Sequence, residues 1–312
     1  MIVCLAANPS VDKLFEIERL VRGDIHRPLG FVQTAGGKGL NAARAAHALG
    51  AEVRAVPLLR GHAGKWLEET LAAEGVPCDP VWTHGENRAS LSVADRETRG
   101  LTEFYEHGSE VPSSAWAELL HAVDVLLPAA GWLAISGSLP IGAPDDAYAD
   151  LVRDARAAGV RVALDAEGAR LRAALGARPE VVKVNAAEAT GLLGVPTARP
   201  AEALSAAQKL RDLAGGDGHA GLVTRGAEGV VVVAPDGMLY EGRLYVRGRF
   251  PVGSGDAFLA GLVAGLDAGG DWPAALRLAL GAAAANAELP GAGRLDPGRA
   301  RALAARADVR PA

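Results

Sequence analysis

The chain of 312 residues is long enough to bury a large core, and its 49% content of apolar residues excludes an intrinsically disordered protein. Its formal net charge of −5 at pH 7 provides no basic field for binding nucleic acid. The two cysteines, Cys4 and Cys78, lie far apart and lack the spacing of metal ligands, which excludes a disulfide framework and a structural zinc site.

The sequence shows no targeting or membrane-spanning pattern. The N-terminus has no basic stretch before its short apolar run, so no signal peptide is predicted. The apolar stretch 125–135 is interrupted by Pro128 and Gly131 and is too short to span a membrane. We therefore expect a cytoplasmic protein that binds neither membranes nor nucleic acid.

Short apolar runs alternate with longer helical stretches along most of the chain, which is the pattern of βαβ units around a buried parallel sheet. The predicted strands are 2–6, 52–58, 132–136, 161–165, 181–184, 221–224 and 229–233. The predicted helices are 38–49, 64–74, 144–158, 167–174, 200–214, 256–268 and 273–288. Segments 11–34 and 88–106 have a period nearer two instead, and we expect them to form a small lid of strands outside the main sheet.

A first glycine-rich motif surrounds Lys38 at the start of the helix predicted over 38–49. Three glycines there leave backbone N–H donors beside an ammonium group, and Asn41 lies one helical turn further on. Such a site suits a ligand with hydroxyls and an anionic group. The alternative is a glycine-rich helix entry with an exposed lysine.

A second motif lies where the strand predicted over 181–184 leads into a helix. Asn185 and Glu188 are three residues apart, so their side chains face the same side. One amide and one carboxylate are adequate outer ligands for a Mg²⁺ ion held largely through water. The same two residues also match a capping box, which is the structural alternative.

The third motif runs from Gly253 to Asp256 and precedes an apolar helix. The two close glycines, Gly253 and Gly255, allow successive backbone N–H groups to point at one anion at the positive end of that helix. A carboxylate at Asp256 is placed to take a proton from a hydroxyl that attacks a phosphate. The alternative is an aspartate that only caps the helix after a glycine turn.

Taken in order, the motifs resemble those of the ribokinase-like sugar kinases of the PfkB family over nearly the whole chain. The matching segments are 36–41, 135–140, 183–188, 223–229 and 252–256. Segments 8–12, 34–41 and 251–256 are most similar to the branch of 1-phosphofructokinases and tagatose-6-phosphate kinases, which make ketohexose bisphosphates.

The resemblance implies a three-layer α/β fold with a mostly parallel central sheet and a small β-sheet lid, in one domain over residues 1–312. It implies Mg²⁺-requiring, ATP-dependent phosphorylation of a ketohexose phosphate, fructose 1-phosphate or tagatose 6-phosphate, and a homodimer formed through the lid. A kinase of a free sugar or nucleoside on the same fold is one alternative. A sugar-phosphate sensor without catalysis is the other.

Site residues follow from the resemblance by position. Asp256 is the implied general base, and Gly253, Ser254 and Gly255 form the implied anion hole. The implied sugar-phosphate contacts are Asp12, Gly37, Lys38, Asn41, Arg88, Ser138 and Arg27, with Lys38 and Arg88 together holding the substrate's phosphate. The implied ATP contacts are Lys183, Thr224, Arg225, Gly226, Ala227, Glu228, Gly229 and Gly255, and the implied metal-side residues are Asn185 and Glu188.

Three positions depart from the family pattern. Val184 replaces the usual proline of the metal-side motif, and Ser254 replaces the common alanine between the two glycines. Glu103 stands where the minor phosphofructokinases resembling this group carry an arginine for the substrate phosphate, which weakens an assignment to fructose 6-phosphate. Arg27 is expected to supply compensating charge across a dimer interface.

Overall fold

Parallel strands form most of a ten-stranded sheet in the computed structural model, which describes residues 1–246 and 248–312. Seven neighbouring strands within the described residues run parallel, in the spatial order β5 (Val81–Thr83), β4 (Val53–Arg60), β1 (Ile2–Ala6), β8 (Trp132–Ser136), β9 (Arg161–Asp165), β10 (Val181–Asn185) and β11 (Ala220–Thr224). The sheet continues through the antiparallel strands β12 (Val230–Val233), β13 (Leu239–Arg243) and β14 (Asp308–Pro311).

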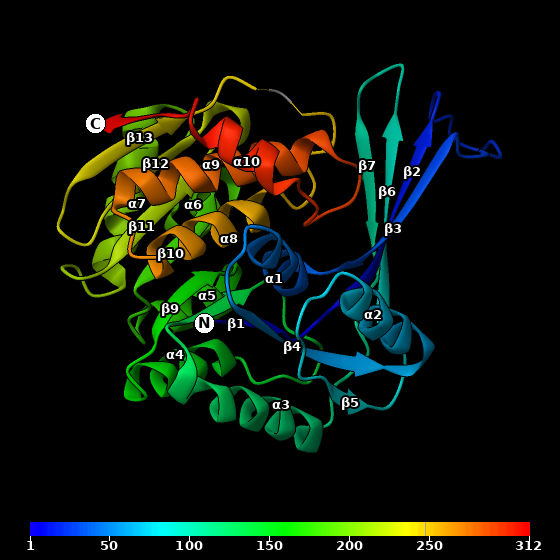
Figure 1. The fold of residues 1–312 in the computed structure, drawn as a ribbon, viewed down its shortest axis with the longest axis horizontal. Coiled ribbons are helices and arrows are strands. Elements are labelled where there is room, and N and C mark those ends of the chain that lie inside the picture. Colours follow the sequence, from blue (N-terminus) through cyan, green and yellow to red (C-terminus); the bar gives the residue numbers. More distant parts are fainter. Residues whose placement is uncertain (247) are drawn as a thin grey trace.

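Helices cover both faces of this sheet (Figure 1). One layer contains α1 (Lys38–Ala48), α2 (Gly61–Ala73), α8 (Ser254–Asp267), α9 (Trp272–Glu288) and α10 (Pro297–Ala304). The other contains α3 (Ser113–Leu126), α4 (Ala147–Ala157), α5 (Gly168–Leu175), α6 (Ala186–Leu193) and α7 (Pro200–Leu213). In β1, Cys4 packs into the first layer and Leu5 into the second, which explains why the strand is apolar throughout.

A second, four-stranded sheet projects from one side of the molecule as a lid (Figure 1). Its order is β3 (Gly30–Gly36), β2 (Ser10–Ile17), β6 (Arg88–Asp95) and β7 (Leu101–Tyr105). Strands β2 and β6 are parallel, whereas the outer pairs are antiparallel. These strands lie in the two segments expected to form the lid, and the predicted α/β class with a small lid sheet is confirmed.

The elements predicted from the sequence are present, with ends that shift by at most three residues. The structure adds elements that the sequence pattern did not predict, namely α3, α10, β5, β13 and β14. No helix within residues 1–246 and 248–312 combines the length and the apolar character needed to cross a membrane.

Candidate active site

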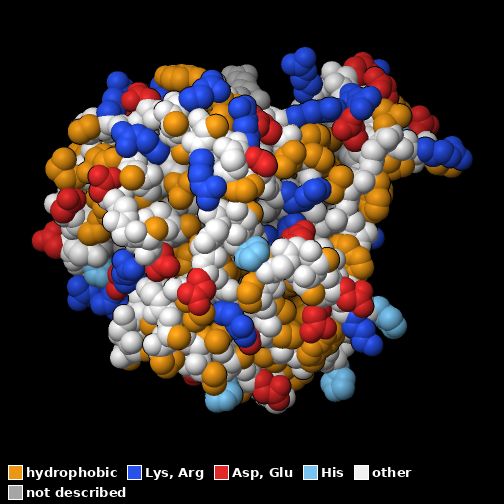
Figure 2. All heavy atoms as spheres, in the orientation of Figure 1, with side chains coloured by type: hydrophobic (Ala, Val, Ile, Leu, Met, Phe, Trp, Pro, Cys, Tyr) orange, Lys and Arg blue, Asp and Glu red, His pale blue; other side chains and the backbone are white. Residues whose placement is uncertain are grey.

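The carboxyl ends of five parallel strands open into one cavity of about 1110 Å³. Ligands of open α/β sheets bind beyond these strand ends, where connections diverge to the two faces of the sheet. Figure 2 shows the hollow between the body and the lid. The last residues of these five strands all line the cavity: Ala6, Ser136, Asp165, Asn185 and Thr224.

The first glycine motif allows α1 to begin directly against the end of β1. A Cβ atom on Gly39 would lie 2.0 Å from the carbonyl oxygen of Leu5, so a larger residue would push the helix away. Gly37 caps the helix with a φ of 90°, a conformation that favours glycine. Its N–H donates to Asp12 Oδ2 at 3.4 Å, and burial raises the pKa of Asp12.

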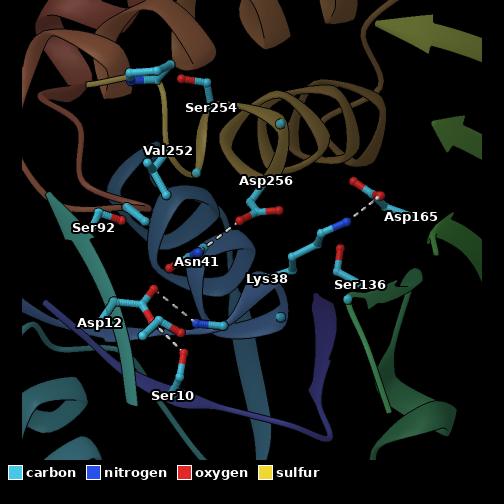
Figure 3. Close-up of a pocket in the computed structure, with 18 of the residues that line it drawn as sticks. Ser10, Asp12, Lys38, Asn41, Ser92, Ser136, Asp165, Val252, Ser254 and Asp256 are labelled. Atoms are coloured by element: carbon cyan, nitrogen blue, oxygen red, sulfur yellow. Dashed lines mark hydrogen bonds and ion pairs between the residues drawn. The ribbon is translucent and has the colours of Figure 1, made fainter. Parts of the chain in front are cut away.

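The second glycine motif presents Asp256 in the first turn of α8. Gly253 caps this helix with a left-handed φ of 78°, and the side chain of Asp256 is buried. Asn41 Nδ2 donates to Asp256 Oδ2 at 2.8 Å (Figure 3). Burial, reinforced by the negative charge of Asp165, raises the pKa of Asp256 to about 7, so this carboxylate is poised to accept a proton near neutral pH.

Two lysines, Lys38 and Lys183, converge on Asp165 beside this carboxylate, and Figure 3 shows the contact of Lys38. Asp165 ion-pairs with Lys183, and Lys38 Nζ lies 3.5 Å from Asp165 Oδ1 and 3.4 Å from Glu188 Oε1. Burial opposes ionisation of Asp165, but the two ammonium groups outweigh it and hold its pKa below the usual value. Asp165, followed by Glu188, raises the pKa of Lys38, whose ammonium therefore stays charged.

Lys38 and Arg88, which were predicted to hold one phosphate together, both line the cavity but contact different partners within the protein. Lys38 contacts Asp165 and Glu188, whereas Arg88 donates to the carbonyl oxygen of Asn8 at 3.3 Å and to Ser90 Oγ at 3.1 Å. The two cations thus have separate partners. Because Lys38 extends towards the buried carboxylate of Asp165 and the partly buried one of Glu188, its ammonium lies on the side of Asp165, away from Asp12 in Figure 3.

The family model for pfkB carbohydrate kinases matches residues 6–297 of this chain. The chain belongs to the PfkB family of carbohydrate kinases. A curated 1-phosphofructokinase of Haloferax volcanii is 33% identical to this kinase over 89% of its chain and 88% of the relative's. Another, from Xanthomonas campestris, is 32% identical over 85% and 83% of the two chains.

Solved structures agree with this assignment. The kinase superposes on phosphofructokinase-2 from Escherichia coli, solved in complex with potassium, with a TM-score of 0.88 and 25% identity over 98% of each chain. The expected ribokinase-like fold is therefore confirmed. As a member of this family, the protein is an enzyme that transfers a phosphoryl group to a hydroxyl.

Most residues expected at the site line the cavity of this kinase. Three of the expected residues lie outside the lining: Arg27, Arg225 and Glu228. Arg27 is exposed in the loop between β2 and β3 and does not reach the cavity within one chain. Arg225 donates instead to the carbonyl oxygen of Ala198 at 2.7 Å, and Glu228 is exposed.

Asn185 and Glu188 form the capping box that was the alternative to a metal site. Asn185 Oδ1 accepts from the N–H of Glu188 at 2.9 Å, and Glu188 Oε2 accepts from the N–H of Asn185 at 2.7 Å. The carboxylate retains lone pairs for a further partner, so a role beside a hydrated Mg²⁺ remains compatible with the cap. In the part of the chain that the structure describes, no group of three or more His, Cys, Asp or Glu side chains could hold a metal by itself.

Sequence reasoning missed Asp165, which lines the cavity, and Asn286, which supports the cavity wall from α9. Asp165 was detectable, since it is an acid at the end of a correctly predicted strand. Asn286 lies in α9 and is fully buried, and its Nδ2 donates to the carbonyl oxygen of Val252 at 2.8 Å and to Ser254 Oγ at 3.2 Å. These two bonds attach α9 to the turn that contains Gly253. No local pattern reveals this contact, because the two segments are distant in the sequence.

Proposed function

We propose that this kinase transfers the γ-phosphoryl group of ATP to the free hydroxyl of a ketohexose phosphate, with fructose 1-phosphate or tagatose 6-phosphate as substrate. The observation that carries the proposal is the place of Asp256 between two cationic regions of one cavity. Lys38 and Lys183 lie on the Asp165 side, and Arg88 lies on the lid side near Asp12. One region suits the phosphates of ATP and the other suits the phosphate of the sugar.

The mechanism that we propose is an in-line displacement. Asn41 holds Asp256 Oδ2, which leaves Oδ1 to accept the proton of the sugar hydroxyl. The hydroxyl oxygen then bonds to the γ-phosphorus while the bond to the bridging oxygen breaks and ADP leaves. Backbone N–H groups of Gly253 and Gly255 at the start of α8 would offset the charge on the transferred group. The N–H of Ser254, also expected in the anion hole, donates instead to the carbonyl oxygen of Pro251 at 3.1 Å.

Residues around the cavity divide between the two ligands. We assign the sugar phosphate to Asp12, Gly37, Asn41, Ser138 and Arg88, and the nucleotide to Lys183, Thr224, Gly226, Ala227 and Gly229. The two hydrogen bonds of Arg88 occupy only part of its five donors, so it can still hold a phosphate. Asn185 and Glu188 would hold Mg²⁺ through water, and the ion would neutralise negative charge on the nucleotide.

Glu103 supports the choice of substrate. Its carboxylate accepts from Ser92 Oγ at 3.4 Å and from the hydroxyl of Tyr105 at 2.5 Å, and both of these residues line the cavity. A negative charge on this face of the lid disfavours a substrate phosphate beside it. The sugar phosphate is therefore assigned to Arg88 and not to β7, and we do not propose fructose 6-phosphate.

We also propose a homodimer through the outer face of the lid. Phe31 and Phe104 are more than half exposed there, with exposed fractions of 56% and 57%, and Phe15 packs against Phe31 with ring centroids 5.5 Å apart. Exposed aromatic side chains gathered on one sheet face are typical of an interface. In such a dimer, Arg27 would extend towards the partner's cavity.

A panel of acceptors tests the proposed function. The purified kinase is assayed by coupled ADP release with fructose 1-phosphate, tagatose 6-phosphate, fructose 6-phosphate, fructose and ribose, at saturating ATP and Mg²⁺. We expect the highest kcat/KM with one of the first two sugars. A higher kcat/KM with a free sugar would contradict the substrate class, and binding without turnover would indicate a sensor.

A further inference from the structure

Asp165 is a fully buried carboxylate that the proposed mechanism does not use. It ends β9, and its backbone carbonyl oxygen accepts from the N–H of Gly137 at 3.0 Å, which fixes the end of the strand. An ionised carboxylate in such a position is costly unless cations and hydrogen bonds compensate it. The compensation comes from Lys38 at the start of α1 and Lys183 in β10.

The Lys183 ammonium lies beside Gly255 in the motif from Gly253 to Asp256. A Cβ atom on Gly255 would lie 3.1 Å from Lys183 Nζ, so the glycine leaves room for this ammonium at the start of α8. Both lysines line the cavity together with Asp256. The stem of Lys38 packs on Gly137, where a Cβ atom would lie 3.1 Å from Lys38 Cβ. The same backbone that holds Asp165 therefore also supports Lys38.

We propose that Asp165 is a positioning residue for phosphoryl transfer, which holds the ammonium groups of Lys38 and Lys183 together at the start of α8. This inference rests on the proposed function, because it places the phosphates of ATP at that point. Lysine has a flexible four-carbon stem and loses much rotamer freedom when it is fixed. Asp165 reaches both lysines, whereas Glu188 reaches Lys38 alone in the described contacts, so Asp165 joins the pair.

Removal of the carboxylate has a predictable consequence. Lys183 is almost fully buried, with an exposed fraction of 3%, and without Asp165 it becomes a buried ammonium without its ion-pair partner. Such a group is no longer held in place, because an unpaired buried charge is costly. The start of α8 then loses a fixed positive charge, and the nucleotide loses a partner.

A double-mutant cycle tests this inference. We compare the wild type with Asp165→Asn, Lys183→Met and the double variant, and measure kcat, KM for ATP, and calorimetric affinity for a non-hydrolysable ATP analogue. Each single variant is expected to lower kcat/KM for ATP by about 10²-fold or more, the scale of losing a charged group in the transition state. The two losses should combine less than multiplicatively in the double variant, because Asp165 acts in part through Lys183 and only its contact to Lys38 remains to be lost.

The matched control is Glu167→Gln, which removes a carboxylate from the same cavity wall. Glu167 only adds to the long-range field at Lys38, and the variant should stay within about threefold of the wild type. If Asp165→Asn fails to fold, the double variant, which has no unpaired charge, still allows comparison with Lys183→Met.

Two results would overturn the inference. One is that Asp165→Asn retains more than a third of the wild-type kcat/KM and the same affinity for the analogue. The other is that the losses of the two single variants multiply in the double variant, which would mean that Asp165 acts independently of Lys183. Neither result depends on which sugar is the acceptor, so the acceptor panel and this cycle can fail separately.

Discussion

Asp256 combines three features that few carboxylates share: burial in a helix start, a hydrogen bond that occupies one oxygen, and two ammonium groups nearby. Burial and the charge of Asp165 make it a stronger base than an exposed aspartate, while Lys38 and Lys183 keep its ionised form accessible. The balance places its pKa where a general base works best at neutral pH.

A pH–rate profile tests this balance. A base with a pKa of about 7 must be deprotonated to work, so kcat/KM for the sugar should fall about tenfold per pH unit below that value. The measurement is kcat/KM from pH 5.5 to 9 at saturating ATP. Residual turnover of Asp256→Asn should lack this acid limb. A wild-type profile that stays flat down to pH 5.5 would contradict a raised pKa at Asp256.

The same shift predicts a pH-dependent stability. Between pH 3.8 and about 7, folded Asp256 keeps a proton that the unfolded chain has lost, so the free energy of unfolding falls as pH rises across this interval. The Asp256→Asn variant has no proton to lose at this position, so its free energy of unfolding does not fall in this way. By the rule of about 1.4 kcal/mol per pKa unit, its free energy of unfolding at pH 8 should exceed that of the wild type by on the order of 2–4 kcal/mol. Urea unfolding at pH 8 and pH 5 measures the difference, and a variant less stable at pH 8 would refute it.

At the scale of elements, Glu188 has two roles at the start of α6: it caps the helix and it lines the cavity beside Lys38. Glu188→Gln weakens both the contact to Lys38 and the proposed water-mediated metal site, so the Mg²⁺ concentration for half-maximal rate should rise severalfold. Loss of the cap should cost about 1 kcal/mol or less. Titration of activity with Mg²⁺ and thermal unfolding measure the two effects.

Glu202→Gln is the control for Glu188→Gln. Glu202 Oε2 accepts from the N–H of Arg199 at 3.0 Å in the capping box of α7, and neither residue lines the cavity. This variant should lose similar stability without a change in metal dependence. If Glu188→Gln shows only the same stability loss, Glu188 is a helix cap and nothing more.

The lid contributes Arg88 from the first residue of β6. If its guanidinium grips the substrate's own phosphate, Arg88→Ala should lower kcat/KM for the sugar phosphate about ten- to a hundredfold and should spare the unphosphorylated sugar. Kinetics with both sugars at saturating ATP measure this. Arg96→Ala is the control, because Arg96 lies on the same lid, pairs with Glu16 and does not line the cavity. Equal proportional losses for both sugars would show that Arg88 only supports the lid.

The sequence predicted those elements whose formation depends on the residues within the element itself. Strands 132–136 and 161–165 match the structure because each is a short apolar run buried on both faces. The pairing of β13 with β14 joins segments about seventy residues apart, and no local pattern encodes it. Helix α3 had a signal, since Trp116, Leu119 and Val123 follow helical spacing, but it interrupts the simple alternation of strands and helices.

The candidate site was predictable in its composition and less so in its geometry. The glycines around Lys38 and Asp256 have steric reasons that a sequence pattern reveals. No sequence pattern reveals the direction of the Lys38 side chain, because its flexible stem can reach either end of the cavity. The buried charge of Asp165 determines which end the ammonium occupies. The orientation of Lys38 therefore depends on the tertiary contact of β9, β10 and α1.

At the scale of the whole molecule, the cavity is lined by elements from both sheets, with the strand ends and α8 on one side and the lid on the other. Closure of the lid over the proposed sugar site would exclude water and so limit transfer of the phosphoryl group to water. The base, the anion hole and the lid are thus useful only together. The proton transfer from the sugar hydroxyl to Asp256 is the step at which all three act.

The turnover of Asp256→Asn tests that step most directly. Asparagine is nearly isosteric but cannot accept the proton, so we expect kcat to fall about 10²- to 10⁴-fold with the sugar phosphate that the wild type uses best. Calorimetric affinity for that sugar phosphate and for ATP should change little, because the cavity keeps its shape. Retention of more than a third of wild-type turnover by a folded Asp256→Asn variant would contradict the assignment of Asp256 as the base.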